Sequence, residues 1–158
     1  MQDDPQDTTG DAEPAARPPK DPTQSLRTAM LAYIVANALV GLPLLVFPAS
    51  FLDLIGFEAG VADGLGGIRW VGAILVAWAV GSSLVIARPE GRATLVTTGA
   101  LQMTFAAVAL LWSLTTGDKW GSTAFHIGMF ALFAATALVM WAARFSARKV
   151  FKGTQHPA

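Results

Sequence analysis

The chain has 158 residues, of which 53% are hydrophobic and only 14% are charged, and its mean hydropathy is +0.49. A soluble domain carries about 25% charged residues, so this composition excludes an ordinary soluble protein. The net charge is zero, which gives no basis for nucleic-acid binding. Cysteine is absent, which excludes disulfides, thiolate metal sites and thiol redox chemistry.

Residues 1–25 differ in composition from the rest of the chain. They hold five of the nine prolines and six acidic residues, with almost no large apolar side chain. Such a segment cannot bury enough surface to fold, so we predict a disordered cytoplasmic tail. The acidic start also differs from a cleaved secretory signal. We therefore expect the first apolar segment to direct the chain to the membrane.

Four apolar segments follow, and each approaches the length of about 20 residues that a membrane-spanning helix needs. None of them contains Asp or Glu. The predicted fold is all-α, a four-helix transmembrane bundle within residues 26–143. Because the later connections are short, we expect an up-down-up-down order in which the second and third spans form a hairpin. The predicted spans are residues 26–47, 64–88, 93–114 and 122–143.

The connection between the first two spans begins with PASFLDLIGF. Its apolar residues Phe51, Leu52, Leu54 and Ile55 have helical spacing. This pattern predicts a short amphipathic helix that lies in the membrane interface. The alternative is a loop that makes ordinary apolar contacts.

Small side chains recur on the second span. Ala73, Ala77 and Gly81 are four residues apart and form a stripe on one helical face. In membranes such a stripe lets a neighbouring helix approach closely. Other transmembrane helices, in a homo-oligomer or a larger membrane complex, are therefore expected partners beside the bilayer lipid.

Lysine and arginine are distributed unevenly. Nine lie in the tails or in the link between the second and third spans, and only Arg69 and Lys119 lie on the other side. The positive-inside rule then places both termini in the cytoplasm. Residues 144–158 form a basic tail that we expect to rest on anionic lipid. Tyr33 and Trp141 are placed in the inner aromatic belt.

Two amides lie near the middle of predicted spans. Asn37 is in the first span and Gln102 in the third, and these spans run in the same direction, so the amides share a depth. Polar groups inside a bilayer are candidate sites. The two side chains either form an interhelical hydrogen bond, which is the favoured interpretation, or face a ligand.

A second group of candidates lies toward the outer side. Arg69 is inside the second span when that span starts after Asp63, and His126 is one turn into the fourth. An arginine at this level needs a carboxylate, backbone carbonyls or an anionic ligand, or it extends to the interface. Arg69, His126 and Asp63, with the deeper Asn37 and Gln102, are the candidate ligand-binding residues. No catalytic residue, metal site or cofactor is predicted.

The segments NALVGLPLLVFPASFLDLIGF and GLGGIRWVGAILVAWAVGSSLVIARPEGR carry a family resemblance over about residues 30–92. The chain resembles small bacterial four-helix membrane proteins of the DoxX-like group. In these proteins the first helix ends in a short apolar segment, and an arginine opens the second. The resemblance implies a multi-pass protein of the bacterial inner membrane and implies no catalytic residue.

Two functions follow from these observations. The first is a non-enzymatic accessory or scaffold component of a membrane complex, favoured by the small-residue stripe and by the absence of catalytic groups. The alternative is the binding or transport of a small amphipathic molecule (a lipid, a quinone or an anion) at an outward-facing site near Arg69 and His126. No acid lies within a span, which disfavours a proton-coupled exporter.

Overall fold

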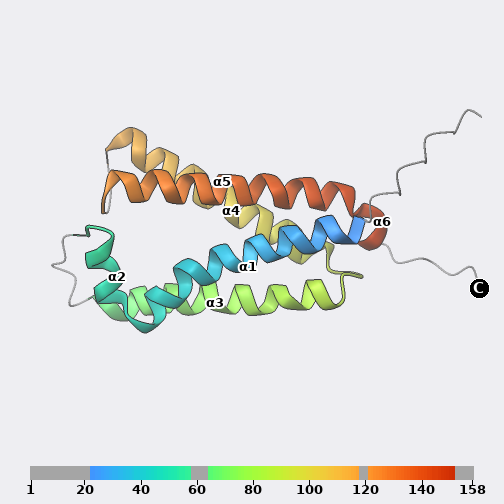
Figure 1. Cartoon of the computed structure of the whole chain (residues 1–158), viewed down its shortest axis with the longest axis horizontal. Helices are drawn as coiled ribbons and strands as arrows, with labels where there is room; N and C mark the ends of the chain where they lie inside the picture. Colours follow the sequence, from blue (N-terminus) through green and yellow to red (C-terminus); the bar gives the residue numbers. More distant parts are fainter. Residues whose placement is uncertain (1–21, 58–63, 118–120, 152–158) are drawn as a thin grey trace, which may run out of the picture.

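The computed structural model describes residues 22–57, 64–117 and 121–151. Four long helices pack as a bundle, and a short helix, α2, lies in the first connection (Figure 1). The predicted all-α four-helix bundle with a short helix after the first span is therefore confirmed. The helices are α1 Pro22–Val46, α2 Pro48–Leu54, α3 Leu65–Ala87, α4 Ala93–Thr116, α5 Thr123–Ser146 and α6 Arg148–Phe151.

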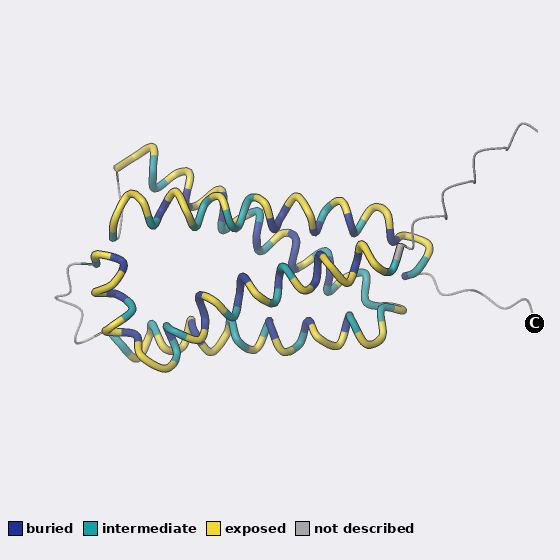
Figure 2. The backbone as a smooth tube through the Cα atoms, viewed as in Figure 1, coloured by how far each residue is buried: buried dark blue, intermediate teal, exposed yellow. Residues whose placement is uncertain are grey.

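Each of the four long helices is long and apolar enough to cross a membrane. Their outward faces carry large apolar side chains, and Trp70, Trp112 and Leu138 are each about 70% exposed. Figure 2 shows that exposed residues recur along all four helices. Apolar surface on this scale is incompatible with water but is what lipid requires. The protein is an integral membrane protein with four spans.

Helix α1 begins and helix α5 ends outside the predicted bounds. Helix α1 starts at Pro22, not near residue 26. Proline suits the first position of a helix, where a backbone N–H would have no hydrogen-bond partner within the helix. Helix α5 continues to Ser146, past the predicted end at residue 143, and α6 follows it directly. The remainder of both predicted tails lies outside the described residues.

Both the start of α1 and helix α6 lie at one end of the bundle, which we call the α6 end; α2 lies at the opposite, α2 end (Figure 1). Helix α1 packs closely on α3 and on α5, and α4 packs closely on α5. Helices α3 and α4 touch little. The short link of residues 88–92 connects α3 to α4 as predicted, but the two helices do not pack closely against each other. Arg88 has an extended backbone (φ −144°, ψ 91°), so the chain leaves α3 without folding back tightly on it.

The small-residue stripe on α3 faces away from the bundle. Ala73 and Ala77 are exposed, and a Cβ on Gly81 would meet nothing within 4 Å. The prediction that this stripe admits a neighbouring helix is not met inside the bundle. The buried face of α3 consists instead of Gly72, Ala79, Ser82 and Val85.

The core is concentrated at the α6 end. Buried side chains of α1 meet those of α3, α4 and α5 there, and Phe151 of α6 closes the cluster. The largest fully buried side chains include Tyr33, Met30, Met103 and Met140.

Helix α2 is attached to the start of α5 at the other end. It begins with Pro48 at its first position and is followed by Gly56 with φ +76°, a conformation that favours glycine. The Ser122 amide donates to the Ile55 carbonyl oxygen at 2.8 Å. The Phe51 and Phe125 rings meet edge to face, with centroids 6.2 Å apart. Helix α2 thus links the first connection to the start of the last span.

Candidate functional site

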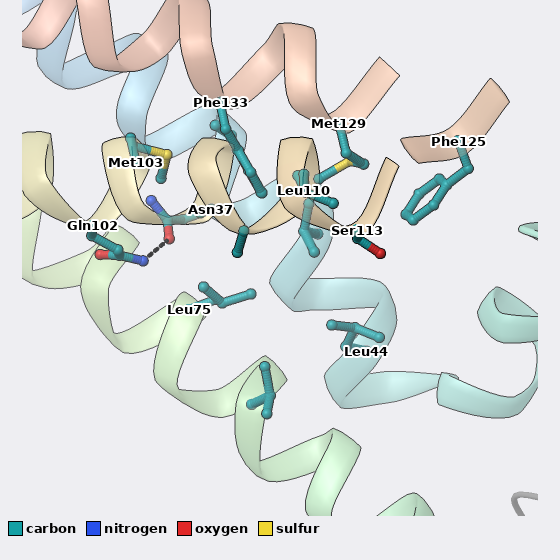
Figure 3. Close-up of a pocket in the computed structure, with 15 residues that line it drawn as sticks. Asn37, Leu44, Leu75, Gln102, Met103, Leu110, Ser113, Phe125, Met129 and Phe133 are labelled. Atoms are coloured by element: carbon teal, nitrogen blue, oxygen red, sulfur yellow. Dashed lines mark hydrogen bonds between the residues drawn. The ribbon is translucent and has the colours of Figure 1, made fainter. Parts of the chain in front are cut away.

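A cavity of about 310 Å³ lies between the four long helices, in the half of the bundle nearer α2 (Figure 3). Its volume is at the lower end of the range of about 300–1,000 Å³ that is usual for ligand pockets. Residues of both α3 and α4 line it, so the space between these loosely packed helices belongs to the cavity. Most of the wall is apolar and includes Val40, Leu44, Leu75, Leu110, Met129 and Phe133.

The polar lining residues are Asn37, Gln102 and Ser113. Asn37 is on α1 and Gln102 on α4, each close to the middle of its helix. Gln102 Nε2 donates a hydrogen bond to Asn37 Oδ1 at 3.2 Å, which Figure 3 marks. The expected hydrogen bond between the two amides is present, and both side chains also line the cavity.

Tyr33 completes this polar group. Its hydroxyl donates to Gln102 Oε1 at 2.5 Å. Asn37 Nδ2 donates to the backbone carbonyl of Tyr33, four residues earlier, at 2.9 Å. The three side chains form a closed network that starts and ends at Tyr33, and we call it the amide ring.

One backbone carbonyl sets the direction of every bond in the amide ring. A carbonyl oxygen only accepts, so Asn37 must turn its nitrogen toward Tyr33 and its oxygen toward Gln102. Gln102 must then present its nitrogen to Asn37 and its oxygen to the Tyr33 hydroxyl, which donates. The orientation of both amides is therefore fixed without a ligand.

The amide ring retains hydrogen-bonding capacity. A carboxamide has two N–H donors and two acceptor positions on its oxygen. The hydrogen bonds among the described residues use one donor and one acceptor position of Asn37 and the same of Gln102. One N–H and one acceptor position on each amide are available to a molecule in the cavity.

His126 is fully buried in the first turn of α5. Its Nδ1 lies 3.3 Å from the Ser122 carbonyl oxygen, and its ring meets that of Phe125 edge to face at 6.1 Å. His126 is not among the residues that line the cavity, whereas Phe125 is. The histidine is thus next to a lining residue at the α2 end but does not line the cavity itself.

Arg69 is exposed near the start of α3 and does not line the cavity. Asp63, the carboxylate expected near it, lies outside the described residues. Of the five predicted ligand-binding residues, the structure brings Asn37 and Gln102 together at the cavity. It does not bring Arg69 to them.

Sequence reasoning missed Tyr33. The prediction placed it in an aromatic belt, but the side chain has no exposed surface and bonds to Gln102. The available signal was spacing: residues four apart share a helix face, so Tyr33 lies on the same face as Asn37.

Within the described residues, no cluster of three or more His, Cys, Asp or Glu side chains is placed to hold a metal ion. The polar groups of the cavity are neutral amides and a hydroxyl. They can donate and accept hydrogen bonds and can hold a polar group in a fixed orientation.

Comparisons with protein-family models, with curated proteins and with solved structures found no match. The fold and the cavity together define a small four-span integral membrane protein with a polar group in the middle of the membrane.

Proposed function

We propose that this protein binds a small, neutral, largely apolar molecule in the cavity between its four spans. The observation that carries this proposal is the position of the amide ring. Two side chains with unused hydrogen-bonding groups lie at a largely apolar cavity in the middle of a membrane protein. A bilayer makes such groups costly to leave unpartnered.

The lining supports a neutral ligand. None of the described residues that line the cavity carries a charge. A charged head group at this depth has no partner of opposite sign and would lose its hydration. A carbonyl, ether or hydroxyl group is suited to the remaining N–H groups of Asn37 and Gln102. The apolar walls would contact the rest of the molecule.

Native mass spectrometry of the full chain in nanodiscs, followed by solvent extraction of the released molecule, tests this proposal. Gln102→Leu removes one polar contact, and Thr98→Val serves as the matched control. Thr98 is an exposed residue of the same helix whose hydroxyl bonds to the Thr94 carbonyl oxygen. We expect the wild type and Thr98→Val to retain the same neutral molecule and Gln102→Leu to retain about tenfold less.

Two results would contradict the proposal. One is a wild-type protein that releases nothing beyond bulk lipid. The other is a Gln102→Leu variant that stays folded, as helical circular dichroism would report, and retains as much of the molecule as the wild type.

The remaining predicted site residues extend the same proposal. Arg69 lies near the start of α3, Asp63 precedes that helix in the sequence, and His126 is next to the lining residue Phe125 at the α2 end. Transport would require the molecule to pass this end. With the positive-inside rule, the α2 end faces outward from a bacterial inner membrane, and both termini are cytoplasmic. The DoxX-like resemblance is consistent with this location and stays a prediction.

A second candidate function is that of an accessory or scaffold subunit. The observation that favours it is the exposed stripe of Ala73 and Ala77 on α3, a surface that allows close approach of another helix. Because the chain lacks cysteine, Ala77→Cys introduces a single thiol for crosslinking in membranes. Ala135→Cys, on the exposed face of α5 and also near mid-helix, is the control. Crosslinking at Ala77→Cys alone supports this function, whereas equal or absent crosslinking at both positions opposes it.

A further inference from the structure

A hollow of about 520 Å³ lies at the α6 end of the bundle. Its lining residues are Ala93, Arg144, Arg148, Lys149 and Phe151. Three cations from the last turn of α5 and from α6 thus share one concave surface. The hollow is separate from the cavity at the amide ring, since the two share no lining residue.

Positive charge dominates the described residues of this end. The described residues place six cations there, namely Arg27, Arg88, Arg92, Arg144, Arg148 and Lys149. The described residues also include two carboxylates. Asp53 is in α2 at the opposite end, and Glu90 is in the connection between α3 and α4 at the α6 end. Glu90 is exposed and precedes Gly91, whose amide donates to the Phe151 carbonyl oxygen at 3.3 Å. Among the described residues, one carboxylate beside six cations at this end favours the approach of anions.

Arg144 is held in place on two sides. Its Nε donates to Thr97 Oγ1 at 2.9 Å, and its guanidinium carbon lies 5.1 Å from the centre of the Phe151 ring. Thr97 in turn donates to the Ala93 carbonyl oxygen at 2.8 Å, which fixes the hydroxyl as an acceptor for the arginine. These contacts use Nε and one face of the guanidinium. Its two terminal NH₂ groups remain to contact an anion.

Arg148 is ordered in a similar way. Its guanidinium carbon lies 4.9 Å from the centre of the Phe145 ring. The Phe145 ring stacks on Trp141, with centroids 5.8 Å apart. Stacking on an aromatic face reduces the freedom that an arginine loses when it binds. The half-exposed Phe145 also provides an apolar surface beside the cations.

The depth of the cluster matches that of lipid headgroups. Helix α5 has 24 residues, and at about 1.5 Å per residue it exceeds the roughly 30 Å hydrocarbon core. Arg144 lies in its last turn, and the other two cations follow it. The hollow is therefore expected at the membrane surface on the side of the α6 end.

We propose that this hollow binds a phosphate group. Two oriented guanidinium groups and one ammonium suit an anion with several oxygens, because arginine makes paired hydrogen bonds to phosphate and lysine adds a point charge. The phosphate can belong to the headgroup of an anionic phospholipid or to a soluble phosphate ester. The chemistry of recognition is the same for both.

The test measures lipid binding to the full chain in detergent by native mass spectrometry. Phosphatidylglycerol is compared with diacylglycerol of the same acyl chains, which lacks the phosphate. The variant Arg148→Gln/Lys149→Gln removes two exposed cations of the hollow, and Arg69→Gln removes one at the α2 end as the control. A cation near the membrane surface contributes about fivefold in binding, so we expect the double variant to bind phosphatidylglycerol about 25-fold more weakly.

A separate arm identifies the source of the phosphate. Thermal stability is measured with glycerol 1-phosphate added to delipidated protein. Stabilisation by this solute that the double variant loses identifies a soluble ester, and stabilisation by phosphatidylglycerol alone identifies lipid; each result supports a phosphate site. Phosphatidylglycerol binding no tighter than that of diacylglycerol would overturn the proposal. So would an Arg69→Gln variant weakened as much as the double variant.

Discussion

The backbones of Gly41 in α1 and Gly72 in α3 are in direct contact. A Cβ built on Gly72 would lie 2.8 Å from the Gly41 carbonyl oxygen and 2.6 Å from the Leu45 nitrogen. A Cβ on Gly41 would lie 2.8 Å from Leu75 Cβ. None of these three distances is sterically possible without movement, so the helix pair depends on glycine at both positions. This contact draws α3 toward α1 at the level of the cavity.

Gly72→Ala is therefore expected to separate α1 from α3. The new methyl group meets α1 backbone atoms, which cannot turn aside as a flexible side chain would, and overpacking of this kind costs about 1–3 kcal/mol. Gly81→Ala in the same helix is the control, because a Cβ there meets nothing within 4 Å. Alanine favours a helix over glycine by about 0.5–1 kcal/mol, so this variant is expected to be unchanged or slightly more stable. Unfolding in mixed micelles measures both, and equal behaviour of the two variants would contradict the glycine contact.

The amide ring predicts a measurable coupling between Tyr33 and Asn37. Tyr33→Phe keeps the buried ring but removes the donor to Gln102 Oε1. We expect it to lower the free energy of unfolding by about 0.6–2 kcal/mol, the range for a hydrogen bond between membrane helices. Because all three side chains share one network, Tyr33→Phe combined with Asn37→Ala should destabilise by less than the sum of the single effects. Strict additivity in this double-mutant cycle would show that the hydrogen bonds of the amide ring are not cooperative.

The depth of the two amides could be predicted from the sequence, but the partner that orients them could not. Helix rise fixes how far Asn37 and Gln102 lie from the ends of their spans, so a shared depth follows from residue numbers. Tyrosine is common at membrane interfaces, and the prediction for Tyr33 followed this general preference. It therefore missed that Tyr33 and Asn37, four residues apart, lie on the same face of α1.

The face of α3 that packs against α1 could likewise not be predicted from the sequence. Two sets of small residues on α3 were equally suited to packing, one containing Gly72 and the other formed by Ala73, Ala77 and Gly81. In the structure the first set packs, with Gly72 against Gly41 of α1. The few contacts between α3 and α4, and the cavity that both helices line, could not be derived from the length of the connecting segment.

Filling the cavity should remove ligand binding without loss of the fold. Ala106 lines the cavity on α4, and Ala106→Phe places a ring in its volume of about 310 Å³. Filling a preformed space with apolar atoms is usually neutral or stabilising. Val108→Phe, on the exposed side of the same helix, adds a ring that faces lipid and serves as the control. The molecule extracted from the wild type should be absent from Ala106→Phe and present in Val108→Phe; retention in both variants would place the ligand elsewhere.

The attachment of α2 to α5 depends on Gly121. A comparison with Gly117 distinguishes the steric effect of a side chain at Gly121 from the cost of a positive φ. Gly121 has φ +89°, and a Cβ there would lie 2.8 Å from the Ile55 carbonyl oxygen, which accepts the bond from the Ser122 amide. Gly117 has a similar φ of +78°, but a Cβ there meets nothing within 4 Å. Alanine at either position carries the conformational cost of positive φ, about 1 kcal/mol or more.

Only Gly121→Ala also pushes α2 away, because the new methyl group occupies the space of the Ile55 carbonyl. Hydrogen exchange of the Ser122 amide should therefore accelerate in Gly121→Ala and stay near the wild-type rate in Gly117→Ala. Equal acceleration in both variants would mean that turn strain alone loosens this end, and that the hydrogen bond from Ser122 to Ile55 does not hold α2.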